Sequence, residues 1–121
     1  MQTCHLLNYP RVSRKQLTHC IQRTSWLNEG PSGTFSEEIM AQQQLSWTYD
    51  ALVFLHLNDP HQFIPEHYRV MLARHPAVIV TSPYPIQAFR RLPFKPFDFL
   101  NEPLSFENFA NCLDKYVAIY G

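Results

Sequence analysis

The stretch that decides the fold is Leu52-Val53-Phe54-Leu55-His56-Leu57-Asn58-Asp59-Pro60. Residues 51–57 form the most apolar segment of the chain. A run of this length and character is typical of a strand that is buried on both faces, because helices cover both sides of a parallel sheet. Asp59-Pro60 then ends the strand. We therefore predict the central strand of a parallel sheet at residues 51–57.

Further apolar runs alternate with helical patterns on both sides of this strand, which is typical of a doubly wound α/β fold. The other predicted strands are residues 3–7, 28–35, 77–81 and 97–100, and Gly30, Pro31 and Gly33 place residues 28–35 at an edge of the sheet. The predicted helices begin with a capping box at Ser13 and Gln16, at Ser36, near Pro65, before Ala88, and at Ser105. The sum is five strands and five helices in alternation, a doubly wound (βα)5 three-layer sandwich, and this order fits many α/β folds, flavodoxin-like ones among them.

The composition is that of one domain, residues 1–121, with a single core. Ten basic residues balance ten acidic ones, so the chain has no overall field that attracts nucleic acid or an anionic membrane. No apolar run approaches the roughly 20 residues needed to cross a bilayer. Residues 2–5 show no basic region and no cleavage site of a secretory signal. We therefore expect a cytoplasmic protein.

The cysteines and histidines do not predict a metal site. The three cysteines, Cys4, Cys20 and Cys112, lie far apart in the sequence, and buried free thiols are the simpler interpretation. The six histidines show no metal-ligand spacing, so solvated or core positions are expected for them. A small basic cluster, Arg90, Arg91 and Lys95, is interpreted as a solvated face.

Three stretches of the chain carry a resemblance to a known family. Residues 52–60, 78–84 and 97–106 resemble the strands and loops of response-regulator receiver domains, which are CheY-like. Among receiver domains, the sequence is most similar to the receivers of LytTR-type response regulators. The resemblance spans Cys4 to Tyr116, and it implies a receiver domain of two-component signal transduction and phosphorelay.

The functional positions of the family fall on residues that differ from its pattern. The resemblance places the acidic pair on Leu7 and Asn8, the phosphate-accepting aspartate on His56, and the lysine on Glu102. The residue that lends a carbonyl to magnesium is Asn58, the switch hydroxyl is Ser82, and the aromatic switch position is Phe99. The resemblance also implies a cis peptide bond before Pro103.

These departures remove the groups that receiver phosphorylation uses. The reaction needs a carboxylate nucleophile, a divalent cation held by hard oxygen ligands, and a cation facing the phosphoryl group. We therefore expect a degenerate receiver that is not an enzyme, binds no Mg²⁺ and acts by contact with other proteins. Three alternatives stay open: a conventional phospho-accepting receiver, phosphorylation at Asp59, and a small enzyme on the same fold.

The family's aspartate–lysine pair has become His56 and Glu102, with the charge signs reversed. We hypothesise that these side chains touch, which would favour protonated His56. Two other interpretations stay open. In the first, His56 is only a polar residue at a strand end whose hydrogen bonds are satisfied. In the second, the pair senses protons.

The resemblance also implies where partners bind. Receivers meet partners through the fourth helix, the fifth strand and the fifth helix, which here carry Tyr84 and Phe99, and a homodimer through this face is one expectation. LytTR-type regulators continue into a DNA-binding domain, and the sequence leaves open whether the natural protein does so. The domain itself is expected to bind no nucleic acid and no membrane.

Overall fold

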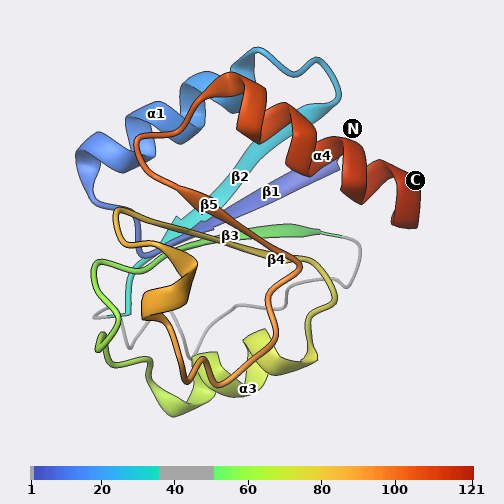
Figure 1. Ribbon diagram of the computed structural model, residues 1–121. Coiled ribbons are helices and arrows are strands. Elements are labelled where there is room, and N and C mark those ends of the chain that lie inside the picture. The colour runs from blue at the N-terminus through green and yellow to red at the C-terminus, as the bar shows by residue number, and fades with distance from the viewer. Residues whose placement is uncertain (1, 36–50) are drawn as a thin grey trace.

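The computed structural model describes residues 2–35 and 51–121. These residues form an α/β domain around a five-stranded parallel sheet of order β2-β1-β3-β4-β5 (Figure 1). The strands are β1 (Gln2–Leu7), β2 (Leu27–Gly33), β3 (Leu52–His56), β4 (Val78–Ser82) and β5 (Asp98–Asn101). All residues of β3 are buried, and β3 is the central strand, as its apolar run predicts. The edge position predicted for residues 28–35 is also confirmed, because β2 ends the sheet.

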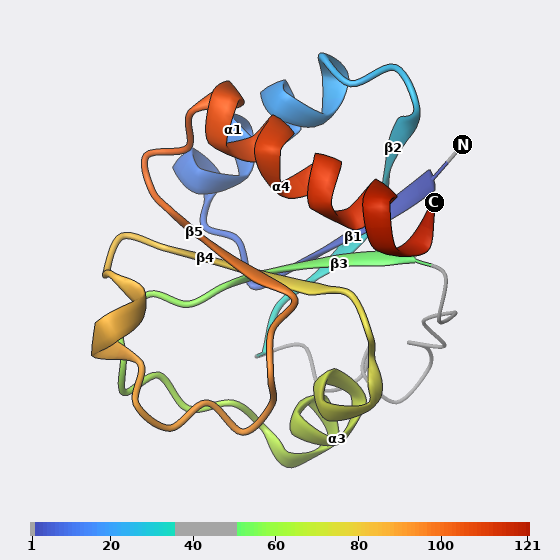
Figure 2. The same cartoon turned by 45° about the vertical axis from the view of Figure 1, so that its right-hand side comes forward.

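Helices cover both faces of the sheet. The helices α1 (Arg11–Gln22) and α4 (Phe106–Tyr120) lie side by side on one face, and α3 (Glu66–Arg74) lies on the other (Figures 1 and 2). Two hydrophobic cores result. The core under α1 and α4 contains Phe54 and Phe109, whose rings stack with centroids 5.8 Å apart. The core over α3 contains Leu55 and Tyr68.

The predicted helix around Ala88 is wrong. The chain forms only a short 3-10 helix there, η1 (Ile86–Ala88), and residues 89–97 contain no helix or strand. Pro85 precedes this turn and Pro93 follows it, and because the residue before a proline avoids the helical region, at most residues 86–91 could be helical, which is less than two turns of α-helix. The helix expected at Ser36 lies outside the described residues. Over the described ranges the structure has five strands and three α-helices, so the predicted (βα)5 pattern is confirmed only in part.

Of the three helix starts that the sequence predicts from serines, the two within the described residues have different outcomes. Ser105 caps α4, and its Oγ accepts a hydrogen bond from the N–H of Asn108 at 3.1 Å. The capping box at Ser13 is wrong, because α1 begins earlier, at Arg11, with Pro10 as its N-cap. The fixed φ of proline favours a helix start at this point. Because Ser13 is not the N-cap of α1, its hydroxyl can make another contact.

None of the helices within residues 2–35 and 51–121 is long and apolar enough to cross a lipid bilayer.

Candidate functional site

The candidate site lies where the carboxyl ends of the strands meet. Because the sheet is parallel, the last residues of β1, β3, β4 and β5 share one edge, which is where open α/β sheets bind ligands. The register pairs His56 at the end of β3 with Thr81 in β4, and Ser82 with Asn101 at the end of β5. Glu102 follows directly and donates its N–H to the carbonyl of Ser82 at 2.8 Å.

His56 is held by oxygen atoms at both ring nitrogens. Its Nδ1 lies 3.0 Å from Oε2 of Glu102, and its Nε2 lies 2.8 Å from Oδ1 of Asn58. The side chain is only 2% exposed. A neutral imidazole has one N–H donor, whereas an imidazolium has two and satisfies both oxygens at once. The geometry therefore suits an ion pair between His56 and Glu102, in the arrangement that the sequence hypothesis describes.

Glu102 is the centre of a larger hydrogen-bonded group. Its Oε1 accepts a hydrogen bond from Oγ of Ser13 at 3.0 Å, and its Oε2 accepts one from Oγ1 of Thr81 at 3.3 Å. The side chain of Glu102 is 8% exposed. A buried carboxylate is costly unless donors surround it, and this one faces three. The group defined by Tyr9, Ser13, His56, Asn58, Thr81 and Glu102 is called the His56–Glu102 cluster below.

Tyr9 closes the cluster on the side of α1. Its hydroxyl lies 2.7 Å from Oγ1 of Thr81, and its ring centroid lies 5.4 Å from that of His56. Burial of the hydroxyl raises the pKa of Tyr9 well above its usual range, the hydrogen bond to Thr81 lowers it, and the charge of Glu102 raises it further. Tyr9 therefore stays protonated and can donate to Thr81, which in turn donates to Glu102.

A pH experiment tests the enclosure of Tyr9. The unfolded chain releases the Tyr9 proton near pH 10, whereas the folded protein keeps it. Because the folded pKa is raised, this contribution to stability is complete below about pH 10 and is lost as the pH rises above it. Tyr9→Phe should make the fall in unfolding free energy above pH 10 shallower by up to about 1.4 kcal/mol per pH unit. Urea unfolding at several alkaline pH values measures the slope.

The matched control for this experiment is Tyr84→Phe, which removes the hydroxyl of an exposed tyrosine. Equal slopes for Tyr9→Phe and Tyr84→Phe would contradict the enclosure of the Tyr9 hydroxyl.

The positions at the carboxyl end of β1 contribute little chemistry to the cluster. Leu7 is 2% exposed and packs in the core over α3. Asn8 adopts a left-handed backbone conformation, with φ of 66°, which asparagine tolerates better than most residues. Its Nδ2 donates to the carbonyl of His56 at 3.2 Å. Asn8 therefore fixes the end of β3 by its amide group.

Ser82 lies outside the cluster. Side chains alternate along a strand, so Ser82 points to the opposite face of the sheet from Thr81. Its Oγ accepts a hydrogen bond from the N–H of Tyr84 at 3.1 Å. Phe99 packs its ring 5.3 Å from that of Phe89. The structure thus brings Thr81, rather than Ser82, to His56 and Glu102.

Three members of the cluster were missed in the sequence: Tyr9, Ser13 and Thr81. A signal existed for two of them. Ser13 shares a helical face with Leu17 and Cys20, which are buried, so it points inward. Thr81 ends the predicted strand at residues 77–81, and the parallel register of the structure pairs it with His56. The Glu102–Pro103 peptide bond is cis, as the resemblance implies.

Metal ligands are not grouped in the part of the chain that the structure describes. No set of three or more His, Cys, Asp or Glu side chains there is arranged to hold a metal ion. The three cysteines are free and buried, in agreement with the simpler interpretation of the sequence.

Comparison with known proteins identifies the fold. No family model matches the sequence, and no curated protein matches it. Solved structures do match. A CheY-like response regulator from Mesorhizobium loti has a TM-score of 0.67 at 15% identity, over 93% of this chain and 96% of that one. A response regulator receiver protein from Pseudoalteromonas atlantica has a TM-score of 0.65 at 14% identity, over 98% and 99% of the two chains.

A third match is the response regulator RcsB of Salmonella typhimurium, in a structure that concerns DNA interaction. It has a TM-score of 0.70 at 10% identity, and covers 98% of this chain but 60% of its own. Identities this low establish the fold alone. The chain described here has the fold of CheY-like response-regulator receiver domains.

Proposed function

We propose that this chain is a degenerate receiver domain, which acts by contact with other proteins, catalyses no reaction and accepts no phosphoryl group on aspartate. The observation that carries the proposal is the His56–Glu102 cluster. At the end of the central strand, where a receiver presents its acceptor carboxylate, this chain has an imidazole 3.0 Å from a carboxylate. The polar groups there bind one another.

The charge at Glu102 supports the proposal. An incoming phosphoryl group carries nearly two negative charges, and a carboxylate at about 4 Å would cost on the order of 4 kcal/mol per charge pair at a surface-like dielectric. A lysine at this position would stabilise the same group. A conventional receiver therefore requires a positive charge at this position, whereas Glu102 supplies a negative one.

The donor set also fits Mg²⁺ poorly. Magnesium prefers carboxylate oxygens in near-octahedral geometry. Leu7 offers no ligand, Asn8 turns its amide nitrogen toward the carbonyl of His56, and His56 offers nitrogen. The carbonyl of Asn58 alone would not hold the cation. We infer that the pocket takes up no Mg²⁺.

The nearest alternative acceptor is Asp59. Its Oδ1 accepts a hydrogen bond from the N–H of His61 at 2.7 Å, so this carboxylate is already used to form the loop after β3. Phosphorylation at Asp59 would break that contact in a pocket without a cation to offset the added charge. We therefore do not favour this alternative.

We infer that partners, among them a second copy of the chain, bind the surface formed by η1, β5 and α4. The strand β5 is an edge of the sheet, and the exposed fractions of Tyr84 and Ile86 beside it are 45% and 48%. The expected fourth helix of this surface is a 3-10 turn, so the contact differs in shape from one built on a full helix. Sedimentation at increasing concentration tests self-association.

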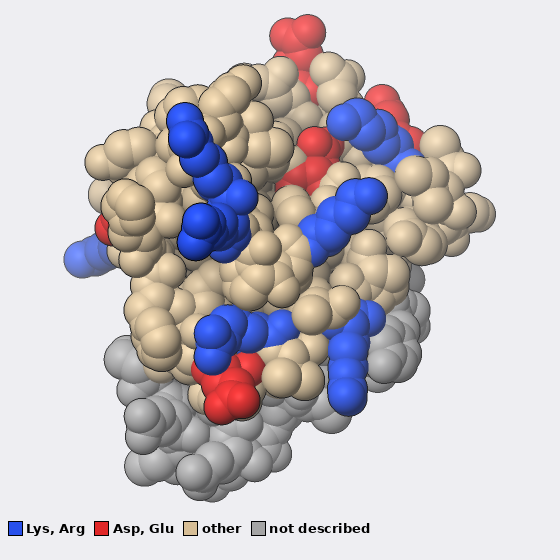
Figure 3. Space-filling model, turned by 60° about the horizontal axis from the view of Figure 1, so that its bottom comes forward, with Lys and Arg blue, Asp and Glu red and all other residues tan. Residues whose placement is uncertain are grey.

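Nucleic acid is a weaker candidate partner. Figure 3 shows the face that includes α3, where Lys and Arg side chains stand in separate groups with uncharged surface between them. Binding to phosphates requires cations along a continuous track.

A phosphorylation assay tests the proposed function. The protein is incubated with acetyl phosphate and Mg²⁺ beside a conventional receiver, and the intact mass of each is measured. We expect a phosphoryl adduct on the conventional receiver and none on this chain. A hydroxylamine-sensitive adduct on this chain would contradict the proposal, and its loss in Asp59→Asn would locate the acceptor.

A further inference from the structure

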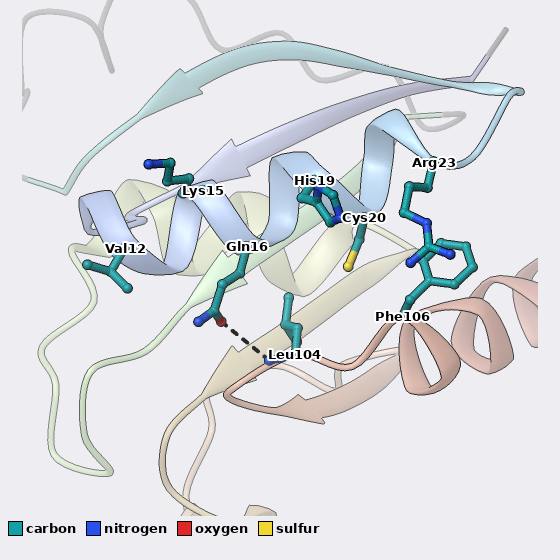
Figure 4. Close-up of a pocket in the computed structure, with 8 residues that line it drawn as sticks. All are labelled: Val12, Lys15, Gln16, His19, Cys20, Arg23, Leu104 and Phe106. Carbon is teal, nitrogen blue, oxygen red and sulfur yellow. Dashed lines mark hydrogen bonds between the residues drawn. The ribbon is translucent and has the colours of Figure 1, made fainter.

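A groove separates α1 from the connection between β5 and α4. Its volume is about 410 Å³, which lies in the range of small-molecule sites. The apolar side chains of Val12, Leu104 and Phe106 line it, together with the cations Lys15 and Arg23 (Figure 4). No carboxylate is among its lining residues. The groove therefore offers apolar contact and positive charge.

Arg23 is the most specific feature of the groove. Its guanidinium carbon lies 4.0 Å from the centroid of the Phe106 ring, so the ring holds the cation in place (Figure 4). Among residues 2–35 and 51–121, the ion pairs of cationic side chains involve Arg14, His56 and Lys115, and neither Arg23 nor Lys15 has one. A stacked guanidinium keeps its N–H edge available for a planar carboxylate.

The walls of the groove are bridged. Oε1 of Gln16 accepts a hydrogen bond from the N–H of Leu104 at 3.4 Å, and Figure 4 shows this bond joining α1 to the opposite wall. Five residues of extended peptide would need an open track of about 16 Å. The bridge interrupts such a track, so the shape favours a compact ligand with one or two rings.

We propose that this groove binds a small apolar carboxylate, whose ring lies against Leu104 and Phe106 and whose carboxylate pairs with Arg23. We expect an anion because the charged side chains of the groove are cations, and we expect a ring because the walls of the groove are apolar. None of the lining residues belongs to the His56–Glu102 cluster, so the proposal does not depend on the fate of the phosphorylation chemistry.

The experiment uses 1-naphthoate as the probe and ¹⁵N–¹H NMR spectra of the whole chain as the readout. We expect saturable shifts confined to amides of α1 and residues 103–106, with a Kd below about 1 mM. The cation 1-naphthylmethylamine has the same rings and should give no saturable shifts. Arg23→Gln should weaken naphthoate binding about tenfold, whereas Arg91→Gln, which changes an exposed arginine after η1, should leave it unchanged.

Arg23 is exposed, so Arg23→Gln is expected to fold, and the dispersion of its NMR spectrum checks this. Three results would each overturn the proposal: no saturation by naphthoate, equal binding of the amine, or unchanged affinity in folded Arg23→Gln. Binding of an acidic pentapeptide at the groove without binding of naphthoate would also overturn it, in favour of a protein partner.

Discussion

Replacing Glu102 with alanine is expected to lower the free energy of unfolding by about 2–4 kcal/mol. The carboxylate accepts hydrogen bonds from Ser13 and Thr81 and lies 3.0 Å from Nδ1 of His56. Alanine leaves all three groups without their acceptor in a site where the His56 ring is 2% exposed. Buried donors that lose a partner cost their full desolvation energy. Urea unfolding at neutral pH measures the loss.

Asp114→Ala is the matched control for Glu102→Ala, because it removes an exposed carboxylate from α4. Its expected effect is within about 0.5 kcal/mol. Glu102→Gln should fall between the two, since the amide keeps one acceptor oxygen. If Glu102→Ala were as stable as Asp114→Ala, the cluster would not contribute to folding and our description of the site would be wrong.

Phe54→Ala is expected to cost about 3–5 kcal/mol. Phe54 lies in the central strand, its exposed fraction is 0%, and its ring stacks on Phe109 of α4 with an angle of 17° between the ring planes. Removal of the ring leaves a cavity between the sheet and α4, and both neighbouring elements are too rigidly packed to fill it. Thermal and urea unfolding both report the loss.

Phe63→Ala provides the comparison for Phe54→Ala, because the exposed fraction of Phe63 is 72%. The expected change is within about 0.5 kcal/mol. A similar loss of stability in the two variants would show that Phe54 is not part of the core, and the assignment of β3 as the central buried strand would fail.

The parts of the fold that the sequence predicts correctly are those that depend on local patterns. Residues 51–57 gave the central strand because a buried parallel strand has a continuous apolar run. Gly30 and Pro31 indicated an edge strand because they weaken a ladder of hydrogen bonds. Ser105 indicated a helix start because a serine oxygen can accept from the backbone N–H groups of the first turn.

The errors have equally local causes. The apolar residues after Pro85 suggested a helix, but the surrounding prolines restrict the chain to a 3-10 turn. Pro10 starts α1 earlier than Ser13 would. In both places the proline determined the backbone, and the helical spacing of the neighbouring side chains was the weaker signal.

The candidate site could be predicted only in part. The proximity of His56 and Glu102 followed from the family resemblance, because His56 ends β3 and Glu102 directly follows β5 at the same edge of the sheet. The contacts of Tyr9, Ser13 and Thr81 with this pair did not follow, because they depend on how separate elements pack: helical spacing points Ser13 inward but does not name Glu102 as its partner. Such contacts join residues far apart in sequence; Ser13 and Glu102, for example, have a separation of 89 positions. A pattern within a single element can point a side chain inward, but it does not identify the partner that the side chain meets.

The measurement that tests the central claim most directly is an NMR titration with Mg²⁺ and beryllofluoride, a phosphoryl mimic. The claim is that His56, Glu102 and their partners satisfy one another and leave no site for a cation and an anion together. We predict that the amide signals of His56, Asn58 and Thr81 do not move. Saturable shifts at these residues that require Mg²⁺ would contradict the account. They would indicate that the chain is a conventional phospho-accepting receiver.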